Sequence, residues 1–99
     1  MSSENQRPTY RIADLAPSER PRERLAHHGP GALSVAELLA ILLVTGVPGE
    51  NAVEMGTRLL NKYRGLRGLH RATFQQLLGE YGLGEAKASQ LKAALELGY

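Results

Sequence analysis

The sequence predicts an all-α fold, a compact bundle of about five short helices. Helix starts recur along the chain as a Ser, Asn or Thr followed three residues later by Glu or Gln, the pattern that caps a helix N-terminus. No segment alternates apolar and polar residues over the length of a strand, and β-branched residues are sparse. The 99 residues suffice for one small domain, whose core must be aliphatic because 42% of the chain is apolar and only 5% is aromatic.

The N-terminal residues 1–11 are polar and are expected to be flexible, which leaves 12–99 as the folded domain. The first helix is predicted over 19–28, with Ser18 as its cap and Pro21 in its first turn, where a missing N–H is tolerated. A Gly-Pro-Gly run directly after this helix ends it.

The second helix is opened by a capping box of Ser34 and Glu37 and is expected to run to about Val44. Apolar residues occupy nearly every side of this helix, in the run LLAILLV. Because a helix that is apolar all round is normally buried, we expect this one at the centre of the domain.

The remaining helices follow the same start signals. Asn51 with Glu54 opens a third helix, and Thr73 with a glutamine three residues later opens a short fourth one. Between them the stretch NKYRGLRGLHRAT, residues 61–73, contains two glycines and is predicted to be a connection. The last helix is predicted over 85–97, where apolar residues recur at the spacing of one helix face: Ala88, Leu91, Ala94 and Leu95.

A weak internal repeat relates two parts of the chain. LLVTGVPGENAVEM, residues 42–55, resembles LLGEYGLGEAKASQL, residues 77–91, with one insertion at Pro48. Each copy has two leucines, a turn that contains glycine, and a second helix rich in small and apolar residues. The repeat predicts two helix–hairpin–helix units that lie side by side and close each other's core.

The turn Gly82-Leu83-Gly84 has the composition of an anion-binding turn. Glycine tolerates positive φ and removes Cβ atoms from the outer surface, so that Leu83 can anchor the turn in the core. The backbone amides from Gly84 onward open the last helix, and with the positive end of the helix dipole they form a site for a phosphate. Such a site contacts no base edge, so binding would not depend on nucleotide sequence. Lys87, together with Ser89 or Gln90, is the candidate for further contacts with the same backbone, and Lys92 follows two turns farther along the helix.

The same turn has a simpler interpretation, in which the two glycines make a tight corner between helices. Glu85 supports the helix start but would repel a phosphate unless it points away. Charge favours binding, because five cations and no acidic residue lie between Glu54 and Glu80, although a solvated linker would carry the same charges. Three of these cations are taken as candidate DNA contacts: Arg64, Arg67 and Arg71.

Several motifs together resemble the N-terminal region of the RadC-like proteins. They are spread over residues 12–99 and comprise RPRERL (20–25), GPGALS (29–34), AELLAILL (36–43), GLRGL (65–69), GLG (82–84) and KASQLKAALELG (87–98). The resemblance implies a helix–hairpin–helix fold of the SAM or RuvA domain 2-like type, which binds DNA in a protein associated with DNA repair. RadC-like proteins usually continue into a C-terminal JAMM/MPN-type domain, whose His-x-His…Asp zinc motif is absent from this sequence.

One departure from the family concerns the first turn, which is commonly basic but here reads VTGVPGENAVE. Contact with DNA is therefore expected through the second turn. A rival function is a protein-interaction or targeting module for the missing metalloprotease-like domain, and a third is a helical scaffold for that domain. Affinity for DNA that falls steeply with salt would separate the first function from the other two.

Catalysis, cofactor binding and metal binding are not expected. No nucleophile–base pair is evident, and the adjacent His27 and His28 cannot share a helix face. The absence of cysteine excludes disulfides and thiolate–metal sites. No apolar run approaches the roughly 20 residues of a membrane span, and the N-terminus lacks the apolar region of a signal peptide, so a cytoplasmic location is expected. The net charge of +2 is too small to indicate a partner.

Overall fold

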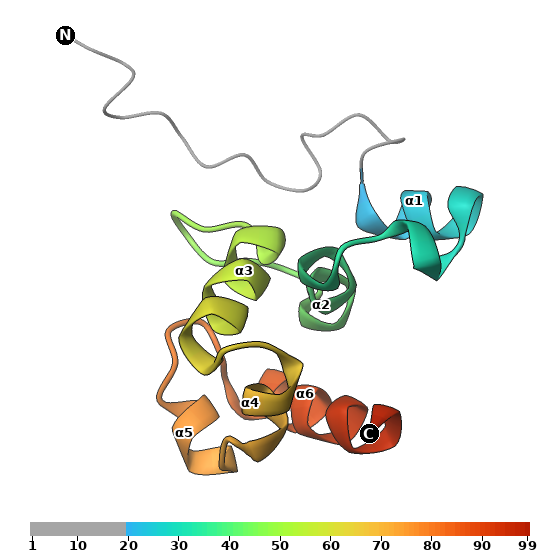
Figure 1. The fold of residues 1–99 in the computed structure, drawn as a ribbon. Helices are drawn as coiled ribbons and strands as arrows, with labels where there is room; N and C mark the ends of the chain where they lie inside the picture. Colours follow the sequence, from blue (N-terminus) through green and yellow to red (C-terminus); the bar gives the residue numbers. More distant parts are fainter. Residues whose placement is uncertain (1–19) are drawn as a thin grey trace, which may run out of the picture.

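The computed structural model describes residues 20–99, and these residues fold as helices joined by turns (Figure 1). The predicted all-α class is confirmed. In chain order the elements are α1 (Pro21–His28), the 3₁₀ turn η4 (Pro30–Ala32), α2 (Val35–Leu43), α3 (Ala52–Tyr63), α4 (Leu66–Arg71), α5 (Phe74–Leu78) and α6 (Glu85–Gly98). The segment 1–11 and the expected cap Ser18 lie outside the described residues.

The predicted capping boxes are present at the starts of α2, α3 and α5. In the first of them Ser34 Oγ accepts a 3.1 Å hydrogen bond from the Glu37 amide, and the Glu37 carboxylate accepts a 2.9 Å bond from the Ser34 amide. Helix α1 differs from the expectation, because it begins at Pro21 with Arg20 at the N-cap position and no side-chain cap.

The sequence does not predict helix α4, because Gly65 and Gly68 indicate breaks in the chain. Gly65 has a φ of +96° and turns the chain after the left-handed Arg64. Gly68 lies inside α4, where a Cβ atom would stand 1.5 Å from the carbonyl oxygen of Tyr63. The glycine therefore allows α4 to pack directly against the end of α3, and Leu69 of α4 is fully buried.

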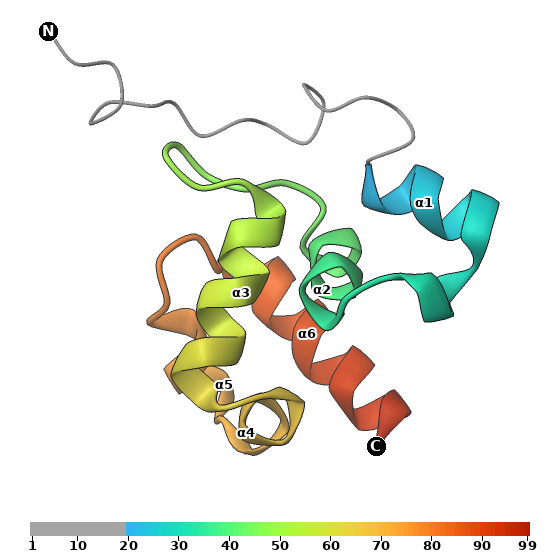
Figure 2. The same cartoon turned by 45° about the horizontal axis from the view of Figure 1, so that its top comes forward.

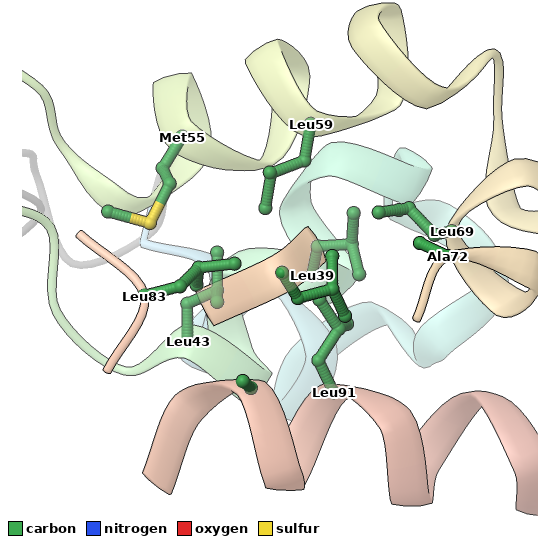
Figure 3. Packing of buried hydrophobic residues seen from close by; sticks show 10 residues of the cluster. Leu39, Leu43, Met55, Leu59, Leu69, Ala72, Leu83 and Leu91 are labelled. Carbon is green, nitrogen blue, oxygen red and sulfur yellow. The ribbon is translucent and has the colours of Figure 1, made fainter. Parts of the chain in front are cut away.

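The core lies between α2, α3 and α6, with α4 and α5 closing it (Figures 2 and 3). Helices α2 and α3 form its largest helix–helix interface. Leu59 of α3 and Leu91 of α6 are both fully buried and reach the same cluster. Its other buried members are Leu39, Leu43, Met55, Leu69, Ala72, Leu77, Leu83 and Ala88. The core is aliphatic, as the composition requires.

Helix α2 is less buried than the sequence predicts. Leu39, Ala40 and Leu43 face the core, but Val35 is 41% exposed and Leu42 is 36% exposed. Helix α1 covers part of α2, and an ion pair between Arg24 and Glu37 joins the two helices. One apolar stripe of α2 is nevertheless left without a covering helix among residues 20–99.

Candidate nucleic-acid interface

Two turns, residues 44–51 between α2 and α3 and residues 79–84 between α5 and α6, lie on the same side of the domain (Figures 1 and 2). Side chains join them directly. The Tyr81 hydroxyl donates to the Pro48 carbonyl oxygen at 3.4 Å, and the Lys87 ammonium donates to the Thr45 carbonyl oxygen at 2.7 Å. The two copies of the sequence repeat are therefore neighbours in space.

The first turn is closed by its own backbone. Val47 and Glu50 exchange two hydrogen bonds of 2.8 and 2.9 Å, and Gly49 between them has a φ of +87°. Gly46 has no room for a side chain, because a Cβ atom would lie 2.2 Å from the Glu50 carbonyl oxygen. Helix α3 begins at Ala52, after its Asn51 cap and not directly after Gly49. In the second copy, α6 begins directly after Gly84.

The two glycines of the second turn have different reasons to be glycine. Gly82 has a φ of +86°, and a Cβ atom there would lie 2.7 Å from Met55 Cε and 2.9 Å from Val47 Cγ1. Gly84 has a φ of −85°, which any residue adopts, and a Cβ atom there would meet nothing within 4 Å. The expected positive φ therefore occurs at Gly82 and not at Gly84. Leu83 between them is 4% exposed and anchors the turn in the core, as expected.

Gly84 is the N-cap residue of α6, and no side chain caps this helix. The first hydrogen bond along the helix runs from the Ala88 amide to the Gly84 carbonyl oxygen, at 2.9 Å. The amides of residues 85–87 precede that bond and have no acceptor within the helix. Glu85 and Ser89 are exposed near this end. The start of α6 thus combines amides that have no acceptor within the helix with the positive end of a helix dipole.

The sequence predicts that Lys87 contacts a phosphate, whereas in the structure its side chain contacts the first turn. Its ammonium donates to the carbonyl oxygen of Thr45 and lies 3.4 Å from the Thr45 hydroxyl oxygen. These contacts hold the start of the first turn against α6. An ammonium group has three donors, so Lys87 keeps capacity for another acceptor while it makes this contact.

Sequence reasoning missed a buried carboxylate, Glu80, which is 7% exposed. Glu80 accepts a 2.6 Å hydrogen bond from the Tyr63 hydroxyl and pairs with Lys62 at 2.7 Å and Arg58 at 3.3 Å. Burial raises the pKa of the Glu80 carboxyl, but the hydrogen bonds and positive charges of these partners outweigh burial and lower it below its usual range. A signal was available, since Glu80 is the acidic residue that ends a long stretch of cations.

Arg58 connects both turns. Its guanidinium donates two hydrogen bonds, of 2.8 and 3.0 Å, to the Glu50 carboxylate in the first turn. It also donates to the Tyr81 carbonyl oxygen in the second turn at 2.7 Å. The hydrogen bond with Glu50, opposed by burial, raises the pKa of Arg58. Arg58 and Lys62 thus serve largely within the fold, although the sequence places them in the cationic stretch.

The three candidate arginines of the cationic stretch are exposed, but they lie at the end of α3 and on α4 and not at the second turn. Helix α4 packs beside the C-terminal half of α6, because Lys92 donates to the carbonyl oxygens of His70 and Ala72 at 2.8 and 2.6 Å. His70 also contacts Glu96 at 3.1 Å. Lys92 is two helical turns, about 10 Å, beyond the start of α6. The predicted residues therefore form two groups: the second turn with Lys87 and Ser89, and the separate group of Arg64, Arg67 and Arg71.

Fold and site together define a small all-α domain in which two turn-linked helix pairs share one core and present their turns on one side. The chain belongs to the UPF0758 N-terminal family, whose model matches residues 12–89. At the level of the family, this match agrees with the resemblance to RadC-like proteins that the sequence motifs indicated.

The curated relatives of the chain include UPF0758 proteins from several bacteria. The one from Bordetella petrii is 58% identical over 85 residues, which are 86% of this chain and 38% of the relative. The one from Roseiflexus sp. is 52% identical over 88 residues, 89% of this chain and again 38% of the relative. The chain thus spans about two fifths of the length of these relatives. No solved structure matches it.

Membrane-spanning helices and metal-ligand clusters are both absent from residues 20–99. None of the helices within 20–99 is long and apolar enough to cross a membrane. In the same range no three His, Asp or Glu side chains are grouped so that they could hold a metal ion.

Proposed function

We propose that this chain is a non-catalytic, sequence-independent DNA-binding domain of a RadC-like protein associated with DNA repair, and that its second turn grips a backbone phosphate. In this proposal the pairs α2–α3 and α5–α6 are two helix–hairpin–helix units. The amides of residues 85–87 bind the phosphate, and because they contact no base edge they position the duplex without selecting its sequence.

The observation that carries the proposal is the glycine at position 84. Neither its φ nor its surroundings require glycine, since a Cβ atom would meet open space. Ser, Asn and Thr cap the starts of α2, α3 and α5, where their side-chain oxygens occupy the amides three residues on. Glycine at the same position of α6 leaves those amides uncovered, and it lets a phosphate approach the backbone closely.

The rest of the second turn supports this geometry. Gly82 lets the turn lie against Met55 and Val47, while Leu83 fixes it in the core. Lys87 brings a positive charge to the first turn of α6. A phosphate bound there would thus meet a prearranged set of donors, and its own negative charge would be favoured by the helix dipole.

The exposed arginines at the end of α3 and on α4 form a second, separate contribution. The side chains of Arg64, Arg67 and Arg71 make no hydrogen bond or ion pair with another residue in the range 20–99. Cations with free donors release counterions when they meet phosphates, and this raises affinity at low salt. In this proposal they contact the DNA backbone at some distance from the second turn.

The test is a titration of fluorescent duplex, forked and single-stranded DNA at several salt concentrations, with the variant Gly84→Asp. Aspartate is a good N-cap, so α6 should be as stable as before while a carboxylate covers the proposed phosphate site. The matched control is Gly31→Asp, which changes the net charge equally at another exposed glycine with open space around it.

We expect the unmodified chain to bind with an affinity that falls as salt rises, with a logarithmic slope of about −0.9 for each duplex phosphate contacted. Gly84→Asp should weaken binding about tenfold or more, equivalent to about 1.4 kcal/mol, while Gly31→Asp changes it little. Replacement of Arg64, Arg67 and Arg71 by Gln should lower the salt slope. Equal binding by the two aspartate variants, or no binding at low salt, would contradict the proposal.

A further inference from the structure

An apolar groove of about 260 Å³ lies between α2, α4 and α6, away from the second turn. Helix α2 contributes the stripe of Val35, Leu38 and Leu42 to this groove, and α6 contributes Leu95 and the C-cap Tyr99. Helix α4 contributes Leu66 together with the polar side chains of Arg67 and His70. Leu66 is 42% exposed and Tyr99 is 87% exposed. Apolar side chains are thus gathered in a groove that the described residues leave open.

The groove explains why α2 departs from its predicted burial. The helix is apolar on nearly every side, a composition typical of helices that are covered all round. One face of α2 packs on the core, but Val35 and Leu42 on the groove side are partly exposed. Exposed apolar side chains that are gathered in a groove are a common feature of interaction sites in proteins. The residue pattern of α2 is therefore that of a helix buried on two sides.

The path of the chain indicates what covers the groove. The family model that matches residues 12–89 describes an N-terminal region, and the curated relatives are more than twice as long as the matched segment. Helix α6 ends at Gly98, which lines the groove, and the ring of Tyr99 stacks on that of His70 with centroids 4.3 Å apart. A polypeptide that continues from α6 thus starts at the rim of the groove.

We propose that this groove is the docking site for the polypeptide that follows this N-terminal region in full-length members of the family. Its occupant is a segment or domain face with apolar side chains, held close by its covalent connection to α6. A short connection gives an effective concentration in the millimolar range, so a modest apolar contact suffices for stable docking. Docking of this kind would leave the second turn, at the other end of α6, free for DNA, but the occupant would compete with DNA for Arg67, which lines the groove.

The experiment uses thiol labelling, because the chain contains no cysteine. Single reporters are introduced as Leu42→Cys and Leu66→Cys in the groove. The control is Val44→Cys, since Val44 is exposed at the start of the first turn and does not line the groove. Labelling rates are compared between the 99-residue chain and a fusion that extends it with the part of the Bordetella petrii relative that follows the matched region, any cysteine there being replaced by serine.

We expect both groove thiols to react about tenfold more slowly in the fusion, as for a tethered occupant bound nine-tenths of the time, and the control thiol to react at the same rate in both proteins. Equal rates at the groove positions would overturn the proposal. So would equal slowing at all three positions, which would mean that the protection is not confined to the groove. If the groove thiols of the 99-residue chain react more slowly as the protein concentration rises, the groove is instead covered by a second copy of the chain.

Discussion

The hydroxyl of Tyr63 lies 2.6 Å from Oε2 of Glu80, and this hydrogen bond joins the last turn of α3 to the segment before α6. The carboxylate oxygen also pairs with Lys62 at 2.7 Å, while the other oxygen faces Arg58 at 3.3 Å. Since Glu80 is buried, these contacts compensate its loss of hydration. Through these contacts with side chains of α3, Glu80 holds the second turn against that helix.

The first prediction concerns the removal of this charge. Glu80→Gln should lower the free energy of unfolding by about 2 kcal/mol, because Tyr63, Lys62 and Arg58 lose their charged acceptor. Urea unfolding followed by circular dichroism at neutral pH measures the effect. The control is Glu96→Gln, whose exposed carboxylate contacts only His70 among the described residues, and which should change stability by less than about 0.5 kcal/mol. Equal stability of the two variants would contradict this account.

The second prediction follows from the pKa of Glu80. Its folded-state pKa is lowered, so the ionised carboxylate stabilises the fold above the unfolded-state pKa near 4.5, and this contribution is lost as pH falls through the lower folded-state pKa. The stability difference between the unmodified chain and Glu80→Gln should therefore shrink below pH 4.5. Urea unfolding of both proteins across the acid range measures it, and a difference that stays constant would argue against the network.

The third prediction concerns Tyr63. The hydrogen bond to Glu80 and burial raise the pKa of Tyr63 from 10.0 to about 12. The protonated hydroxyl therefore stabilises the fold fully below pH 10.0, and this stabilisation is lost as pH rises toward about 12. Titration of tyrosinate absorbance should show a late step that is missing in Tyr63→Phe. If Tyr63→Phe shows the same late step in its tyrosinate absorbance, the raised pKa belongs to another tyrosine.

The fourth prediction separates the two glycines of the second turn. Gly82→Ala should lower the free energy of unfolding by about 2–4 kcal/mol, because alanine is strained at a φ of +86° and its Cβ would press on Met55 and Val47. Gly84→Ser should change it by no more than about 0.5 kcal/mol, since serine is a good cap and space is open there. Urea unfolding of both variants tests the contrast, and similar effects would mean that the turn adapts.

The fifth prediction concerns Gly68 in α4. An exposed helical glycine gains about 1 kcal/mol of stability on replacement by alanine. Gly68→Ala should instead destabilise the domain by about 3 kcal/mol, because its Cβ would collide with the Tyr63 carbonyl oxygen. Gly98→Ala, in the last position of α6 with open space around it, is the control and should not destabilise the domain. Stabilisation by both changes would show that α4 can move away from α3 at little cost.

The fold was predictable where it depends on interactions close in sequence. The capping boxes of Ser34, Asn51 and Thr73 form between residues three apart, and all three are present. The buried position of Leu83 also follows from the local pattern. The role of Gly68 could not be predicted from the local pattern, because the atom that excludes a side chain there is the Tyr63 carbonyl oxygen of another helix, α3. Within the sequence, a glycine at this position indicates a break in the chain.

The site was predictable only in part for the same reason. The open start of α6 is a local property of Gly84 and could be inferred from the sequence. The partners of Arg58, Lys62 and Lys87 lie between 8 and 42 residues away, so nothing in the cationic stretch itself indicated which cations were already paired. The placement of α4 beside the far half of α6 likewise depends on the long-range contacts of Lys92.

The contacts of Arg58 have a consequence for the energetics of binding. Loops that recognise a ligand commonly lose conformational entropy when they become ordered around it, and this loss reduces affinity. Here one guanidinium holds Glu50 in the first turn and the Tyr81 carbonyl in the second, and Lys87 of α6 adds a bond to Thr45 in the first turn. These contacts join the two turns within the domain itself, with no ligand present. A partner that docks across them would therefore retain most of its contact energy as affinity, and loss of Arg58 would weaken its binding without removing a single contact to it.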